Sequence, residues 1–131
     1  MANVLQPSFK QLLLAYLTSN TIKIALMDTG VYTYSSAHDF FDDVSAGVIG
    51  TPVTLASKTV TSGVFDAADP TFTAVTGASV ESFWIYHDTG TPSTSPLIAY
   101  FDTVASGLPV TPNGGDISIT FDNGANKIFA L

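Results

Sequence analysis

The chain has 131 residues and a mass of 13.7 kDa, which is the size of one ordinary folding domain. Eleven acidic residues against four lysines and no arginine give a net charge of −7. No face can therefore carry the cationic stripe that binds nucleic acid or an anionic membrane. The absence of cysteine excludes disulfides, thiolate nucleophiles and thiolate-ligated metals.

Hydroxyl side chains supply most of the polar surface, because the chain has 17 threonines and 13 serines but only 11% charged residues. Threonine favours strands, and the single glutamate and missing arginine leave few helix-promoting residues. The longest unbroken apolar run, residues 12–17, is much shorter than the roughly 20 residues that span a bilayer. It follows no leader-type cleavage pattern. The composition predicts a soluble, β-rich protein without a signal peptide.

The chain begins with a predicted helical segment, residues 1–20, in which Pro7 suits the first turn. Four apolar residues recur there at spacings of three and four: Phe9, Leu12, Leu13 and Tyr16. This spacing predicts a short amphipathic helix over residues 7–17. Residues 21–28 then alternate as a strand, and residues 35–44 predict one or two helical turns.

Residues 21–131 are predicted to form a single all-β domain, a two-sheet sandwich of jelly-roll type. Short β-prone runs separated by Gly, Pro, Asn and Asp carry this prediction: 53–61, 64–65, 71–75, 80–87, 97–102, 116–121 and 127–131. Residues 80–86 and 97–101 are apolar on both faces, as in a buried sandwich strand or a subunit interface, and these two strands are the predicted core. Asn123-Gly124 predicts a hairpin that pairs residues 116–121 with residues 127–131.

Aromatic residues are more numerous than one small core requires, and charges are few for a mean hydropathy of +0.34. Both features favour self-association. Six aromatic residues are candidates for a subunit interface: Phe40, Phe41, Trp84, Tyr86, Tyr100 and Phe101.

No motif predicts a catalytic, cofactor-binding or metal site. Asp-Thr-Gly occurs at Asp28 and at Asp88, and aspartic proteases use this tripeptide to pair two carboxylates. The 60 residues between the two motifs are too few for a bilobal enzyme, so turns are the preferred interpretation. His38 lies near three aspartates, and acid pairs occur elsewhere, but their spacings match no metal-binding motif.

Several segments resemble a family of small tailed-bacteriophage proteins over nearly the whole chain. The segments that carry the resemblance are Ser8 to Lys10, Thr21 to Leu26, Tyr32 to Tyr34, His38 to Val44, Lys58 to Val60, Phe65 to Asp69, Ile85 to Thr91, Ser95 to Tyr100 and Gly114 to Phe121. None of them is a catalytic motif, so the resemblance implies a structural protein of the virion.

Within that role, we expect a capsid decoration (cement) protein on the capsid surface, made in the host cytoplasm. Such proteins are often small β-sandwich trimers, so we expect this chain to form a homotrimer, with the major capsid protein as its second partner. The alternatives are a tail or tail-fibre component that binds a host surface and, remotely, an aspartic hydrolase. Fold analogy does not by itself decide between them.

Overall fold

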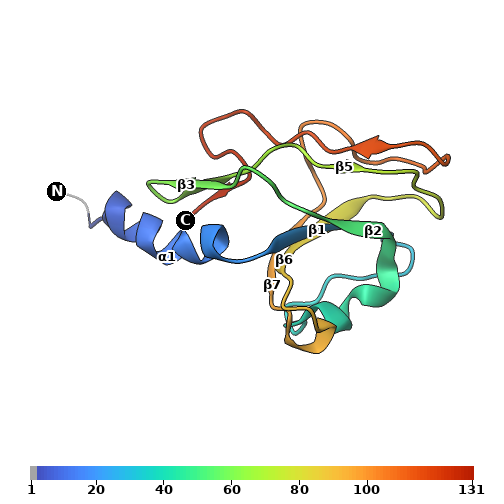
Figure 1. Cartoon of the computed structure of the whole chain (residues 1–131), viewed down its shortest axis with the longest axis horizontal. Coiled ribbons are helices and arrows are strands. Elements are labelled where there is room, and N and C mark those ends of the chain that lie inside the picture. The colour runs from blue at the N-terminus through green and yellow to red at the C-terminus, as the bar shows by residue number, and fades with distance from the viewer. Residues whose placement is uncertain (1–2) are drawn as a thin grey trace.

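The structure, a computed structural model, describes residues 3–131 and is mostly antiparallel β-sheet with one short N-terminal α-helix (Figure 1). Its elements are α1 (Pro7–Ser19), β1 (Ile22–Met27), η1 (Phe41–Asp43), η2 (Ser45–Gly47), β2 (Val48–Thr54), β3 (Thr59–Thr61), β4 (Val64–Asp66), β5 (Thr71–Phe72), β6 (Ser82–His87), η3 (Pro92–Thr94), β7 (Leu97–Phe101), β8 (Ile117–Ser118) and β9 (Phe129–Ala130). The sheets have strand orders β2-β1-β6-β7, β3-β4-β9 and β5-β8, an arrangement compatible with a sandwich.

The two inner strands of the four-stranded sheet, β1 and β6, are almost entirely buried. They pair antiparallel from Ile22 opposite His87 to Met27 opposite Ser82. The predicted core strand over residues 80–87 is confirmed. The core prediction for residues 97–101 is wrong: they form β7, which pairs only with β6 and is half-buried along its whole length because it lies at the sheet edge.

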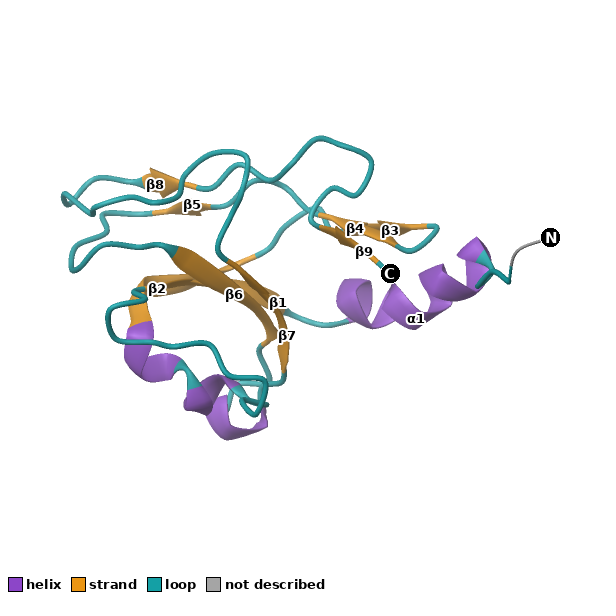
Figure 2. Ribbon diagram, turned by 180° about the vertical axis from the view of Figure 1, so that it is seen from behind, coloured by secondary structure: helices purple, strands orange, loops and turns teal. Residues whose placement is uncertain are grey.

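The four-stranded sheet packs on both faces, because successive residues of β6 point to opposite sides. Phe83 and Ile85 enter the larger core, which the small sheets and the helix also reach. Trp84 enters a second core with Met27, and the segment that contains η1 and η2 covers it. Figure 2 shows the short strands above this sheet and the short helices below it.

The pairing of the last strand differs from the prediction. β9 pairs with β4, so that Phe65 lies opposite Phe129, whereas β8 pairs with β5. At the expected hairpin, the Gly124 N–H donates to the Asp122 carboxylate and closes a local turn instead.

The single strand predicted over residues 53–61 is also wrong. Strand β2 ends at Thr54 and β3 begins at Thr59, because Ser57 adopts a φ of 54° between them. A left-handed residue of this kind breaks a strand.

Helix α1 projects from one end of the sheets toward the N-terminus (Figure 1). It buries only Leu17, and its neighbour is the hairpin formed by β3 and β4. Among residues 3–131, no helix is both long and apolar enough to cross a bilayer.

Candidate assembly surface

The two Asp-Thr-Gly turns lie at opposite ends of β1. Asp28 follows the last residue of the strand and accepts a 2.8 Å hydrogen bond from the Gly30 N–H. The Asp88 N–H donates to the Thr21 carbonyl, just before the strand begins. A strand of six residues separates the two aspartates by roughly 20 Å. Within one chain they therefore cannot form the carboxylate pair that an aspartic hydrolase needs.

The acidic turn that follows His38 is built from local hydrogen bonds. The Asp43 carboxylate accepts hydrogen bonds from the Asp39 and Phe40 N–H groups at 2.9 and 3.2 Å, and these bonds lower the pKa of Asp43. In the part of the chain that the structure describes, no three His, Asp or Glu side chains converge as metal ligands would. The role visible for Asp43 is to cap η1.

Three of the six candidate interface aromatics pack inside the domain. Trp84 and Tyr86 are buried on β6. The Phe41 ring stacks on Tyr86 with centroids 4.1 Å apart and an interplanar angle of 8°. Burial raises the pKa of the Tyr86 hydroxyl to about 12. These side chains hold the segment 28–47 against the sheet and are covered by their own chain.

The other three candidates lie closer to the surface but do not gather on one face. Tyr100 is half-buried on β7, with its ring centroid 5.1 Å from that of Trp84. Phe101 packs on the opposite face of the sheet, 5.0 Å from Phe83. Phe40 is 39% exposed at the bridge to Pro96.

A run of exposed apolar residues lies instead on α1, at the residues whose spacing predicted the helix. Phe9, Leu12, Leu13 and Tyr16 are 47%, 70%, 49% and 46% exposed, and we call these four residues the outer stripe. Residues at these spacings share one helix face. The amphipathic helix is therefore present, but its own chain covers its apolar face only in part: Phe9 and Leu12 face solvent, whereas Leu13 and Tyr16 also border the space between the helix and the sheets.

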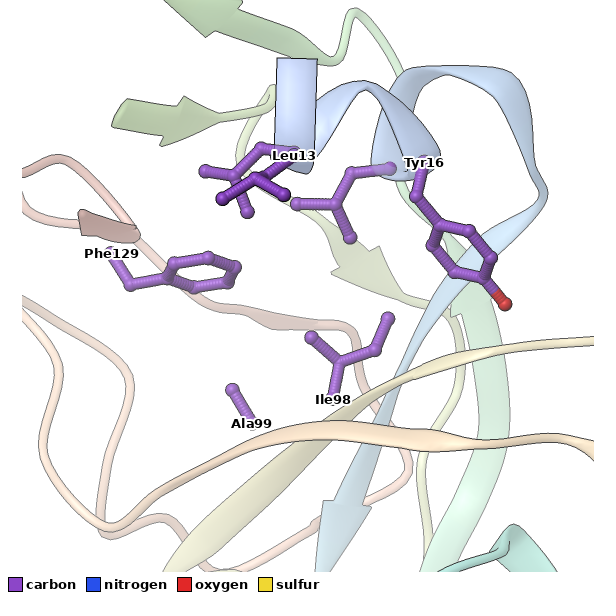
Figure 3. Close-up of a pocket in the computed structure, with 7 residues that line it drawn as sticks. Leu13, Tyr16, Ile98, Ala99 and Phe129 are labelled. Carbon is purple, nitrogen blue, oxygen red and sulfur yellow. The ribbon is translucent and has the colours of Figure 1, made fainter. Parts of the chain in front are cut away.

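A groove runs beside the outer stripe, between α1 and the sheets (Figure 3). It has a volume of about 510 Å³, and we call it the α1 groove; its lining residues are Leu13, Leu14, Tyr16, Leu17, Ile98, Ala99 and Phe129. Leu13 and Tyr16 belong to both the groove and the outer stripe. The two features therefore form one continuous apolar surface without a charged side chain.

Contacts from several faces of α1 hold the helix to the domain. The Ser62 N–H donates to Gln11 Oε1 at 3.1 Å, and the Lys10 side chain lies against Gly63. Near the end of the helix, the Tyr16 hydroxyl forms a hydrogen bond with His87 Nδ1. These contacts fix the orientation of the helix and leave Phe9 and Leu12, in the N-terminal half of the outer stripe, exposed.

The free edge of β7 adjoins the α1 groove. The Leu97 N–H donates to the Asp39 carbonyl at 3.0 Å, which covers the start of the edge. Beyond this bond, no strand within residues 3–131 pairs with the outer side of β7. The strand has no charged residue, and an apolar edge of this kind is a site for association with another chain.

A second hollow, of about 320 Å³, lies on the other side of β7, where Tyr34, His38, Trp84 and Tyr100 line it. Tyr34 is exposed and stacks on Tyr100 with ring centroids 5.3 Å apart. The Trp84 Nε1–H is buried and has no hydrogen-bond partner of normal geometry. Burial raises the pKa of Tyr32, and the nearby Trp84 side chain opposes part of this rise. This hollow offers aromatic faces and hydroxyl groups.

Comparison with known protein families and with curated proteins finds no match to this chain.

Proposed function

We propose that this chain is a non-enzymatic structural protein of a tailed-bacteriophage virion, where it self-associates and decorates the capsid. The observation that carries the proposal is the uncovered apolar surface formed by the outer stripe and the α1 groove. A continuous exposed apolar surface marks an interaction site in small proteins. The segments that resemble phage proteins support the virion as its location, with the major capsid protein as the second partner.

The proposed architecture is a jelly-roll-like sandwich, in which the sheets β3-β4-β9 and β5-β8 together form the second layer. Its support is the larger core, where Phe65 from β4 and Phe72 from β5 pack with Phe83 from β6. Such a domain is small and rigid, as a protein that bridges capsid subunits needs to be.

The mechanism of stabilisation is linkage. A protein that binds only the assembled shell lowers the free energy of that shell relative to free subunits, by mass action. Repetition of the contact over many copies multiplies a modest interface through avidity. No catalytic residue is needed for this role.

The test is the number of copies in purified virions, measured by quantitative mass spectrometry against the major capsid protein. A decoration protein is expected in copy numbers on the order of hundreds per particle, as repeated binding over a shell requires. Full-length protein added to shells that lack it should co-sediment with them and raise their melting temperature. Its absence from virions, or failure to bind shells, would contradict the proposal.

The second candidate is a tail component that binds a host-surface glycan, and the hollow beside Tyr34 favours it. Stacked aromatic rings with free hydroxyl groups suit the apolar faces and hydroxyls of a sugar. A copy number of a few tens or fewer in the virion, with host adsorption lost in Tyr34→Ala, would favour this role over decoration.

A further inference from the structure

We propose that a second copy of this chain covers the apolar surface, with the two α1 helices packed antiparallel across a two-fold axis. Each outer stripe then lies on the outer stripe of the partner, and its N-terminal half reaches the partner's α1 groove. This inference rests on the self-association in the proposed function and adds its surface and its symmetry.

The shape of the surface favours an antiparallel pair. The α1 groove borders the C-terminal half of the helix, where Leu13 and Tyr16 line it. Phe9 and Leu12, in the N-terminal half, contribute to the outer stripe but not to the groove. An antiparallel partner brings its own Phe9 and Leu12 over the groove, whereas a parallel partner leaves the two grooves side by side and unfilled.

The two-fold symmetry follows because each copy both inserts its outer stripe into the partner's groove and accepts the partner's stripe in its own. Leu13 and Tyr16 belong to the stripe and to the groove, so one contact buries both features on both copies. A surface that is complementary to itself forms an isologous, two-fold interface. A trimer is expected by analogy with decoration proteins of this size and fold, but a three-fold ring would need separate donor and acceptor surfaces, or helices packed in parallel.

Charge also favours this pairing over contact between the acidic parts of two copies, residues 28–131, which we call the acidic bodies. Helix α1 contains Lys10 and no acidic residue, so it carries +1, and Lys23, the other lysine before Asp28, lies on β1 and pairs with Asp88. All eleven acids and the other two lysines follow, which leaves −9 on residues 28–131. Helix α1 is therefore the part of the chain where two copies approach with least repulsion.

Antiparallel helices also hold the two acidic bodies apart. A helix of 13 residues is about 20 Å long, roughly twice the Debye length at physiological salt. Parallel helices would place the same bodies side by side. Another occupant, such as a small apolar molecule, would fill the groove but leave Phe9 and Leu12 exposed.

The experiment uses the absence of natural cysteine, because any introduced cysteine is the only thiol of the chain. Leu12→Cys lies near the middle of the outer stripe and is 70% exposed in the single chain. Val31→Cys is the matched control, since Val31 is 64% exposed in the turn after β1. Both full-length variants are treated with a short bismaleimide cross-linker, and the mass of the unmodified protein is measured by light scattering.

We expect the unmodified protein at twice 13.7 kDa, and Leu12→Cys converted to covalent dimer while Val31→Cys remains largely single chains. A mass of one or three chains would overturn the two-fold pair, as would equal cross-linking of both variants. If the protein forms dimers that Leu12→Cys does not trap, this inference fails while the proposed self-association stands. If it is a single chain that also fails to bind capsid shells, the proposed function fails as well.

Discussion

At the scale of single residues, two glycines share a backbone conformation but differ in what surrounds them. Gly63 has a φ of 85° and Gly90 a φ of 92°, a region that other residues rarely adopt. A Cβ at Gly63 would lie 2.6 Å from Lys10 Cβ, whereas a Cβ at Gly90 would meet no atom within 4 Å. Gly63 therefore permits the close approach of α1 to the β3–β4 hairpin.

Gly63→Ala should accordingly destabilise the protein more than Gly90→Ala. Both substitutions carry the backbone cost of a left-handed alanine, about 1 kcal/mol. Gly63→Ala must also displace the helix, which adds about 1–3 kcal/mol. Urea unfolding measures the difference, and equal losses of unfolding free energy in the two variants would show that α1 does not pack closely against Gly63.

Tyr86 gives the stability a dependence on high pH. Burial raises the pKa of its hydroxyl from its ordinary value of 10.0 to about 12, so the folded state favours the neutral form. This contribution is fully present below pH 10 and is lost as the pH rises toward 12, because the unfolded chain ionises first. Tyr86→Phe should lose less stability than the unmodified protein between these pH values. Identical pH profiles of the melting temperature would contradict the assignment.

At the scale of elements, the sequence predicts which residues share a face more reliably than what that face contacts. The spacing of Phe9, Leu12, Leu13 and Tyr16 correctly predicted a helix, yet all four side chains stay about half exposed or more. The apolar run at β7 was predicted to be core or interface, and it forms a half-buried edge strand. Periodicity is a local property, whereas the direction of a face depends on packing partners far away in the chain.

Strand pairing shows the same limit at the C-terminus. Asn123-Gly124 is a good local hairpin signal, but β9 pairs with β4, about 60 residues earlier. Phe129 there meets Phe65, which is fully buried, with ring centroids 5.3 Å apart. Burial of Phe65 supports this register, and no local motif encodes it.

Removal of residues 128–131 should therefore unfold or aggregate the protein by uncovering β4. Ile128 is buried and Phe129 packs against the larger core, and each such side chain contributes about 1.5–3 kcal/mol. Leu131→Ser is the control, because Leu131 is 49% exposed and a surface change typically costs less than about 0.5 kcal/mol. A truncated chain that melts at the temperature of the full chain would disprove the structural role of β9.

At the scale of the whole molecule, apolar attraction at one end of the chain opposes charge repulsion over the rest. A net charge of −7 makes two copies repel each other, while the proposed contact through the uncharged surface at α1 would attract them. The strength of association should therefore depend on conditions that change the charge without changing the apolar contact.

Self-association should tighten as salt is added and as the pH falls from 7 toward the pI of about 4.2. Salt screens the acidic bodies, and protonation of their carboxylates removes the repulsion. Sedimentation velocity at two salt concentrations and two pH values measures this. Dissociation at higher salt would instead indicate an interface held by ion pairs.

The central claim is that the outer stripe of α1 is the surface through which this protein assembles. Sedimentation equilibrium of the unmodified protein, Leu12→Asp and the matched control Val31→Asp tests it most directly, because both variants add one charge at an exposed apolar position. Loss of a buried leucine from each copy should weaken the dimer by at least about tenfold. We predict this weakening for Leu12→Asp alone, with Val31→Asp associating as the unmodified protein does. Equal dissociation constants for all three proteins would contradict the claim.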